Sequence, residues 1–282
     1  MSDFYYELID GDAALDGQRY EMFRATDLVR GPWSSAMQHG APPSALVVRA
    51  LERCAQREDT RLSRVVVDLL GPVPCDGDLW VSARVERPGR QIELIGAEML
   101  AAGPDGMPRP VVRASGWRMQ TADTHTVAHA GAPPFLSRAL IRDDPDKQWD
   151  PAKWKRNYLH SLDWLWLTEP LNEGPAGSWI RSKAELVAGE TMTPIERLFS
   201  VADCSNGVGS KLPMGKWTFL NTDLAVHIFR VPVGEWIGIS AETSYGPDGI
   251  GAAIGTLYDD LGAVASIQQS VLVRPRPPRE RG

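Results

Sequence analysis

The sequence predicts an α+β protein built from two tandem halves, each with a central helix and a long antiparallel sheet. Three observations lead to this prediction: an apolar stretch of helical length in each half, a run of long strands after it, and the recurrence of that order along the chain. A chain of 282 residues is long enough for two domains of ordinary size, each with its own core.

The first half is defined by one helix and the strands on either side of it. A strand is expected around residues 19–26, and a mostly apolar helix follows over residues 42–52, opened by Pro42 and Pro43. A helix that is apolar nearly all round should be buried. Glycine and proline turns then separate four long strands, which are expected over residues 62–70, 79–86, 91–101 and 111–119.

The second half repeats this order. A strand around residues 179–187 precedes a helix over residues 194–204, and the strands after it are expected over residues 217–229, 235–244, 251–258 and 263–273. We therefore divide the chain into four parts: an N-terminal domain (1–120), an interdomain linker (121–156), a C-terminal domain (157–275) and a basic tail of proline and arginine (276–282).

Composition excludes several classes of function. A net charge of -6 argues against a general nucleic-acid-binding surface, so no nucleic-acid partner is expected. No stretch approaches the roughly 18 consecutive apolar residues of a membrane span, and the acidic N-terminus does not resemble a signal peptide. We therefore expect a cytoplasmic protein. The cysteines, Cys54, Cys75 and Cys204, lie too far apart in sequence to indicate a CxxC site.

The familiar sequence motifs for metals, nucleotides and serine nucleophiles are not matched. His125 and His129 have the spacing of a helical zinc pair, but Thr126 stands where the catalytic glutamate would be and no third ligand is indicated. The glycine-rich residues 207–216 do not have P-loop spacing, and no GxSxG elbow occurs. We expect neither a metal nor another cofactor.

An acidic residue ends the second helix, where a carboxylate gains nothing from the helix dipole. Ile195, Leu198, Phe199 and Ala202 form an apolar stripe on this helix, and Asp203 follows them on its last turn. Another interaction must therefore hold the carboxylate there. It either faces water, bonded to Ser205 and Asn206 in the turn that follows, or belongs to a functional site.

The tandem order and three short segments, residues 201–207, 220–223 and 265–271, resemble the acyl-CoA thioesterase II family, whose members are double hotdogs. In a hotdog, a curved antiparallel sheet wraps around a central helix. The resemblance covers about residues 17–275 and implies a hydrolase that acts on acyl-CoA or a related acyl thioester, with a carboxylate-activated water. It implies that Asp203 activates this water and that Gln269 positions it.

Two of the residues implied by the resemblance have an alternative. Gln268 and Gln269 are adjacent in a strand and must face opposite sides, so a register error of one residue would exchange their roles. A family hydroxyl aligns with Asn221, and Thr222 comes one residue later, on the other face unless a bulge intervenes. An asparagine in place of a hydroxyl is a departure from the family pattern.

The first helix is expected to bind substrate through its N-terminus. Backbone N–H groups there are natural donors to the oxyanion of a tetrahedral intermediate, and they follow His39, Gly40 and Ala41. Gly40 would permit a close approach of the substrate. In the alternative interpretation, His39 is an exposed loop imidazole.

Two rival functions remain open at this stage. A hotdog dehydratase or hydratase would use a histidine or aspartate near the helix, and neither predicted helix contains a histidine. A non-catalytic acyl-CoA or lipid-binding protein of the same fold would need no complete set of catalytic groups. One chain should supply both halves of a site, and we expect further association into a homo-oligomer through the remaining sheet edges.

Overall fold

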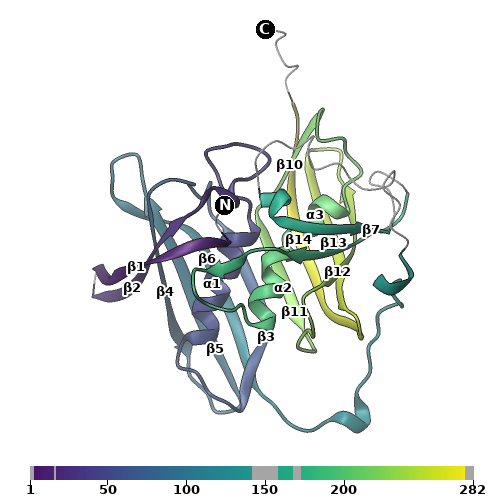
Figure 1. Cartoon of the computed structure of the whole chain (residues 1–282), viewed down its shortest axis with the longest axis horizontal. Coiled ribbons are helices and arrows are strands. Elements are labelled where there is room, and N and C mark those ends of the chain that lie inside the picture. The colour runs from purple at the N-terminus through teal and green to yellow at the C-terminus, as the bar shows by residue number, and fades with distance from the viewer. Residues whose placement is uncertain (1–2, 16, 142–157, 168–172, 277–282) are drawn as a thin grey trace.

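The computed structural model describes residues 3–15, 17–141, 158–167 and 173–276, and it confirms the predicted double hotdog (Figure 1). In these ranges one continuous sheet of 14 strands packs against two helices, α1 (Ala41–Arg53) and α2 (Pro194–Ala202). A third, short helix, α3 (Ser205–Val208), follows α2 almost directly. No helix in the described ranges is long and apolar enough to cross a membrane.

Each half contributes a hairpin, a helix and four long strands. The first half contains β1 (Phe4–Leu15), β2 (Gln18–Ala25), β3 (Thr60–Leu69), β4 (Asp78–Arg87), β5 (Ile92–Ala102) and β6 (Pro108–Gln120). The second contains β7 (Leu162–Trp166), β8 (Ala176–Ser182), β9 (Glu185–Val187), β10 (Trp217–Asn221), β11 (Asp223–Ile228), β12 (Ile237–Tyr245), β13 (Ile250–Asp259) and β14 (Gly262–Pro275). Their orders in the sheet, β3-β6-β5-β4-β2-β1 and β11-β14-β13-β12-β8-β7, match strand for strand.

Strands of the second half pair with both edges of the first half, at β3 and at β1. Strand β3 pairs with β11 in antiparallel fashion, with Val66 opposite Ala225. At the other end the short strand β9 of the second half pairs in parallel with β1, with Val187 opposite Tyr6. The halves therefore form one hydrogen-bonded body.

Two strands predicted as continuous are each broken in the structure. The strand expected over 179–187 divides into β8, which pairs with β12, and β9, which crosses to β1. The strand expected over 217–229 divides at Thr222 because Asn221 pairs with Val271 whereas Ala225 pairs with Gln268, which changes the register on β14. Both breaks depend on pairing with the first half, which local sequence does not contain. The strand β1 was also not predicted.

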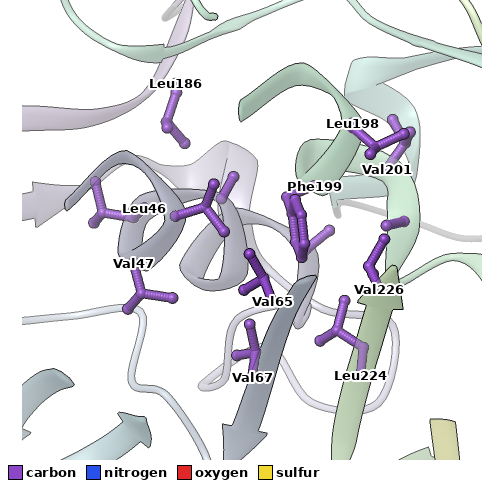
Figure 2. Packing of buried hydrophobic residues seen from close by; sticks show 14 of the residues in the cluster. Leu46, Val47, Val65, Val67, Leu186, Leu198, Phe199, Val201, Leu224 and Val226 are labelled. Carbon is purple, nitrogen blue, oxygen red and sulfur yellow. The ribbon is translucent and has the colours of Figure 1, made fainter. Parts of the chain in front are cut away.

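The core lies between the sheet and the two helices, which contact each other. Figure 2 shows Leu46 of α1 between Leu186 and Val47, and Phe199 of α2 above Val65 of β3. Every residue of α1 from Ala41 to Leu51 is buried, as the continuous apolar sequence predicted. At roughly 1.5–3 kcal/mol for each large apolar side chain, this shared core is the main force that holds the halves together.

One charged residue is buried with the apolar ones. Arg49 of α1 is 1% exposed, and its guanidinium bonds the carboxylates of Glu21 and Glu190 at 2.8 Å each. Arg53 adds a bond to Glu190 at 2.6 Å. Because an unpaired buried charge is costly, these contacts fix α1 against the loop that leads into α2.

The described part of the predicted linker packs on the second half. Phe135 stacks on Tyr258 with ring centroids 4.5 Å apart, and Arg138 bonds Asp260 at 2.8 Å. The segment runs from β6 along the outer side of the second half (Figure 1). Residues 142–156 of the predicted linker and 277–282 of the predicted tail lie outside the described residues.

A carboxyl between the helices predicts how stability depends on pH. Glu52 Oε2 accepts a bond from Thr193 Oγ1 at 2.6 Å, and burial raises the pKa of Glu52 to about 7. The folded protein therefore holds a proton that the unfolded chain releases near pH 4.5. Its contribution to stability is complete below that pH and is lost as the pH rises toward 7.

We therefore expect Glu52→Gln to raise the free energy of unfolding by about 2–3 kcal/mol at pH 8, and by much less at pH 4.5. Urea unfolding at both pH values measures this difference. The exposed Glu242 provides a matched control, since Glu242→Gln should change stability little at either pH. An equal effect of Glu52→Gln at both pH values would contradict a raised pKa.

Candidate active site

The last turn of α2 places Asp203 at the junction of the two halves. The helix begins with a capping box, in which Thr193 Oγ1 accepts from the Glu196 N–H at 3.1 Å and Glu196 Oε2 accepts from the Thr193 N–H at 3.0 Å. Its apolar stripe turns toward the core and carries Asp203 inward at the C-terminal end. The Asp203 side chain is only 4% exposed, so it does not take the solvent-facing alternative.

Two side-chain amides donate to the same oxygen of this carboxylate. Asn221 Nδ2 lies 2.6 Å from Asp203 Oδ1, and Gln269 Nε2 lies 3.3 Å from it. Gln269 Nε2 also lies 3.3 Å from the Asp203 carbonyl oxygen. The structure thus brings together three of the predicted residues, which come from α2, β10 and β14. Hydrogen bonds from both amides fix the orientation of this carboxylate.

Thr222 does not join this group. It lies at the break between β10 and β11, its side chain is exposed, and its Oγ1 is 3.3 Å from Asp223 Oδ1. Period-2 alternation turns Asn221 toward Asp203 and Thr222 away from it. Thr222 is part of the cavity rim only.

The second oxygen, Oδ2, faces the first half. His39 Nδ1 lies 3.2 Å from Asp203 Oδ2, and the same nitrogen lies 3.1 Å from the backbone nitrogen of Ala41. The imidazole packs on the Tyr158 ring with centroids 4.8 Å apart. Burial lowers the pKa of His39 against the opposing pull of Asp203, so the ring is neutral near pH 7. One nitrogen cannot both donate to Asp203 and accept from Ala41, so the tautomer decides which bond forms.

The Asp203 carboxylate leaves no room for a side chain at residue 40, so a glycine is required there even without a ligand. A Cβ at this position would lie 2.6 Å from Asp203 Oδ2 and 2.9 Å from Asp203 Cγ. Its φ of -66° is accessible to any residue, so the constraint is space and not backbone conformation. The N-terminus of α1 and the C-terminus of α2 therefore meet at closest contact at this point.

The first turn of α1 offers fewer backbone N–H donors for an oxyanion than the sequence led us to expect. Pro42 and Pro43 have no N–H, and the N–H of Ala41 points to His39 Nδ1. The N–H of Gly40 makes no hydrogen bond to any described residue and remains the donor of this turn. The predicted helix terminus thus supplies one backbone donor and not several.

A cavity of about 460 Å³ opens beside these residues and has walls from both halves. Asp203, His39, Gly40 and Asn221 line it, whereas Gln269 lies behind Asp203 and is 2% exposed. No lysine or arginine of the described ranges lines the cavity. Its apolar lining consists mainly of aromatic and aliphatic side chains: Trp33, Met37, Leu69, Val73, Leu159, Trp164, Trp166, Val208, Leu212, Met214, Phe219, Leu220 and Leu272.

Several of these residues were not predicted as part of the site. Trp164 and Trp166 are two residues apart on β7 and stack with ring centroids 5.4 Å apart, so they share a face that borders the cavity. Asn206 was expected in a turn beside Asp203, but its Nδ2 lies 3.2 Å from the Phe219 carbonyl oxygen. The alternation of two tryptophans within one short segment was the available signal for Trp164 and Trp166. Asn206 had no comparable signal.

The described residues contain no group of three or more histidine, cysteine, aspartate or glutamate side chains arranged to hold a metal ion. His125 lies in the described part of the linker with an exposed side chain, and His129 is exposed as well. The cavity walls carry a carboxylate, an amide and an imidazole, from Asp203, Asn221 and His39, which can move protons and orient a water molecule.

Two models of one protein family match this chain. An acyl-CoA thioesterase N-terminal domain matches residues 29–119, and an acyl-CoA thioesterase C-terminal domain matches residues 137–273. The chain belongs to the acyl-CoA thioesterase family. A search of curated protein sequences found no match.

Solved structures share the fold at low sequence identity. A hot dog fold protein of unknown function from Alicyclobacillus acidocaldarius has a TM-score of 0.70 at 14% identity, and the match covers 95% of this chain and 96% of that one. The acyl-CoA thioesterase II TesB2 from Mycobacterium marinum has a TM-score of 0.65 at 14% identity, over 94% and 96% of the two chains.

The dehydratase domain of RzxB from Pseudomonas fluorescens is also similar, with a TM-score of 0.52 at 11% identity, over 94% of this chain and 97% of that one. The fold therefore hosts more than one reaction, and the side chains must distinguish them. Neither α1 nor α2 of this thioesterase-family chain contains a histidine.

The two adjacent glutamines of β14 give a prediction about the support of Asp203. Gln269 is buried and Gln268 is exposed, so the register expected from the sequence agrees with the structure. We expect Gln269→Ala to lower kcat about tenfold because it removes one of the two donors to Asp203 Oδ1. Gln268→Ala, the matched control, should change kcat less than twofold.

A third variant separates positioning from packing. Gln269→Glu preserves the size of the side chain but places a second carboxylate against Asp203, which should raise the pKa of the acidic limb in the pH–rate profile. If Gln268→Ala is the more damaging change, or if Gln269→Glu leaves the profile unmoved, Gln269 does not support the carboxylate.

Proposed function

We propose that this chain hydrolyses acyl-CoA or a related acyl thioester with a water activated by Asp203. The observation that carries the proposal is a buried carboxylate in the wall of a mainly apolar cavity, with one oxygen held by two amides. Burial of an ionised group is costly, and a purely structural contact could be made by neutral groups. Family membership adds the class of reaction.

The reaction needs no covalent enzyme intermediate. Asp203 takes a proton from a water molecule in the cavity while the water oxygen attacks the thioester carbonyl carbon. The N–H of Gly40 supports the oxyanion that forms. When the tetrahedral intermediate collapses, the C–S bond breaks, and the proton held by Asp203 goes to the departing thiolate. The products are a carboxylic acid and a free thiol.

The two amides have a supporting role in this scheme. Asn221 and Gln269 hold Asp203 Oδ1, so Oδ2 is the oxygen left to act as the base. This assignment differs from the family pattern, in which a glutamine and a hydroxyl contact the water. Here Gln269 lies behind the carboxylate and does not line the cavity.

A hydrolysis assay over a panel of acyl-CoAs, with detection of the free thiol, tests the proposal. Activity of the unmodified protein on one part of the panel supports it. A non-hydrolysable thioether analogue, titrated by calorimetry, tests binding separately. Binding without hydrolysis of any acyl-CoA would instead support a non-catalytic acyl-CoA-binding protein.

A further inference from the structure

One side chain in the cavity has an acceptor that no described residue satisfies. Asn206 is 4% exposed, lines the cavity and donates through Nδ2 to the Phe219 carbonyl at 3.2 Å. This bond fixes the carboxamide, because a flipped amide would set two oxygens against each other. Its Oδ1 is buried and has no partner among the described residues. A ligand N–H or O–H that reached this oxygen would remove an unfavourable state.

Asn206 lies one helical turn after Asp203. Asp203 and Cys204 have helical backbone angles, with φ of -62° and -67°, so the turn continues from α2 into α3. Residues three apart on such a turn project to the same side. A ligand group bound to Asn206 would therefore be close to the bond on which Asp203 acts.

The other polar groups of the cavity indicate the chemistry of this ligand group. Both ends of the Gln38 carboxamide already have a partner, since Oε1 accepts from the Tyr6 hydroxyl at 2.5 Å and Nε2 donates to the Pro74 carbonyl at 2.7 Å. Trp166 Nε1 is a buried donor without a partner among the described residues. Among the buried side-chain atoms of the described cavity walls, one acceptor and one donor thus lack a partner, and no lysine or arginine side chain lines these walls. A neutral secondary amide, which offers an N–H and a carbonyl, meets this demand.

We propose that Asn206 accepts the N–H of the amide nearest to the sulfur in the thiol arm of the substrate. The inference rests on the proposed function. In a pantetheine thiol, two methylene groups separate the sulfur from this amide nitrogen, a span of less than the roughly 5.4 Å rise of one helical turn. An N–H at that distance from the C–S bond can reach Asn206 while the thioester carbonyl is beside Asp203.

Two thioesters that differ in one group test the contact. The thiol of the first is N-acetylcysteamine, and that of the second is 2-acetoxyethanethiol, in which an ester oxygen replaces the amide N–H. With the same acyl group on both, the unmodified protein should prefer the amide by about tenfold in kcat/KM. Asn206→Leu, which is similar in size and has no acceptor, should reduce this preference to less than twofold.

The outcomes distinguish the inference from its competitors. If Asn206 instead held the attacking water, Asn206→Leu would lower both rates equally and the preference would remain. No preference in the unmodified protein would also overturn the inference. If Asn206→Leu does not fold, Asn206→Ala provides the same comparison. The same acyl group on CoA and on an acyl carrier protein, which share this amide, would show which natural carrier is used.

Failure of the proposed function would have a different signature. The unmodified protein would then hydrolyse neither thioester. Calorimetry with the corresponding thioethers would still test the contact, because affinity for the unmodified protein should depend on the N–H and affinity for Asn206→Leu should not. Equal affinities of the unmodified protein for both thioethers would refute the amide contact without reference to catalysis.

Discussion

Replacement of Asp203 by asparagine is expected to lower kcat about 100- to 10,000-fold while the fold persists, because an amide cannot take the proton of the attacking water. The contacts in the structure explain why the fold should persist. The Oδ1 of an asparagine can still accept from Asn221 and Gln269. Its Nδ2 can donate to His39 Nδ1, which lies 3.2 Å from the present Oδ2.

Steady-state hydrolysis and thermal unfolding together measure this prediction. The exposed Asp105, in the turn between β5 and β6, provides a matched control, since Asp105→Asn removes one carboxylate that does not line the cavity and should leave kcat within twofold. The affinity of Asp203→Asn for a thioether analogue should be close to that of the unmodified protein. Activity of Asp203→Asn within a few-fold of the unmodified protein would refute Asp203 as the base.

The second large effect is expected from a single methyl group at Gly40. A Cβ there would overlap Asp203 Oδ2 at 2.6 Å, so Gly40→Ala must push the carboxylate away from its two amide donors. A displacement of about 1 Å at a reacting group can cost roughly 100-fold in rate. Overpacking should also lower stability by about 1–3 kcal/mol.

Gly131→Ala is the control for Gly40→Ala. Gly131 has no atom within 4 Å of an added Cβ, and its φ is not in the left-handed region. We expect this variant to keep its activity and its melting temperature, whereas Gly40→Ala should lose both in part. A fully active Gly40→Ala would show that the carboxylate is free to move without consequence, which contradicts the proposed geometry.

Local sequence was sufficient to predict the elements that carry the site. The apolar stripe of α2 indicated where Asp203 would be, and strand alternation indicated that Gln268 and Gln269 face opposite sides. Both inferences depend on periodicity within one segment, which the sequence displays directly. The helices and the tandem order of strands could be predicted for the same reason. The choice of Gln269 over Gln268 came from the resemblance to the thioesterase family.

The contacts between the halves could not be predicted in this way. Gly40 and Asp203 lie far apart in the chain, and no periodicity relates them. The break at Thr222, where β10 ends and β11 begins, depends on the pairing of β11 with β3 of the other half. The unmet acceptor of Asn206 depends on the bond between its amide nitrogen and the Phe219 carbonyl, which joins α3 to β10 and has no signal in the local sequence.

The pairing of the second half with both edges of the first half also bears on how such a chain evolves. Because β3 pairs with β11 and β9 with β1, the chain is in effect a dimer whose two subunits are covalently linked. In a dimer of identical subunits every substitution would appear twice. Each subunit would then have to supply both the catalytic carboxylate and the groups that face it. A duplicated and fused pair is free of that symmetry. One copy can supply the carboxylate and its amides, and the other the glycine and imidazole that face it. Each copy can therefore lose the site residues that the other copy provides.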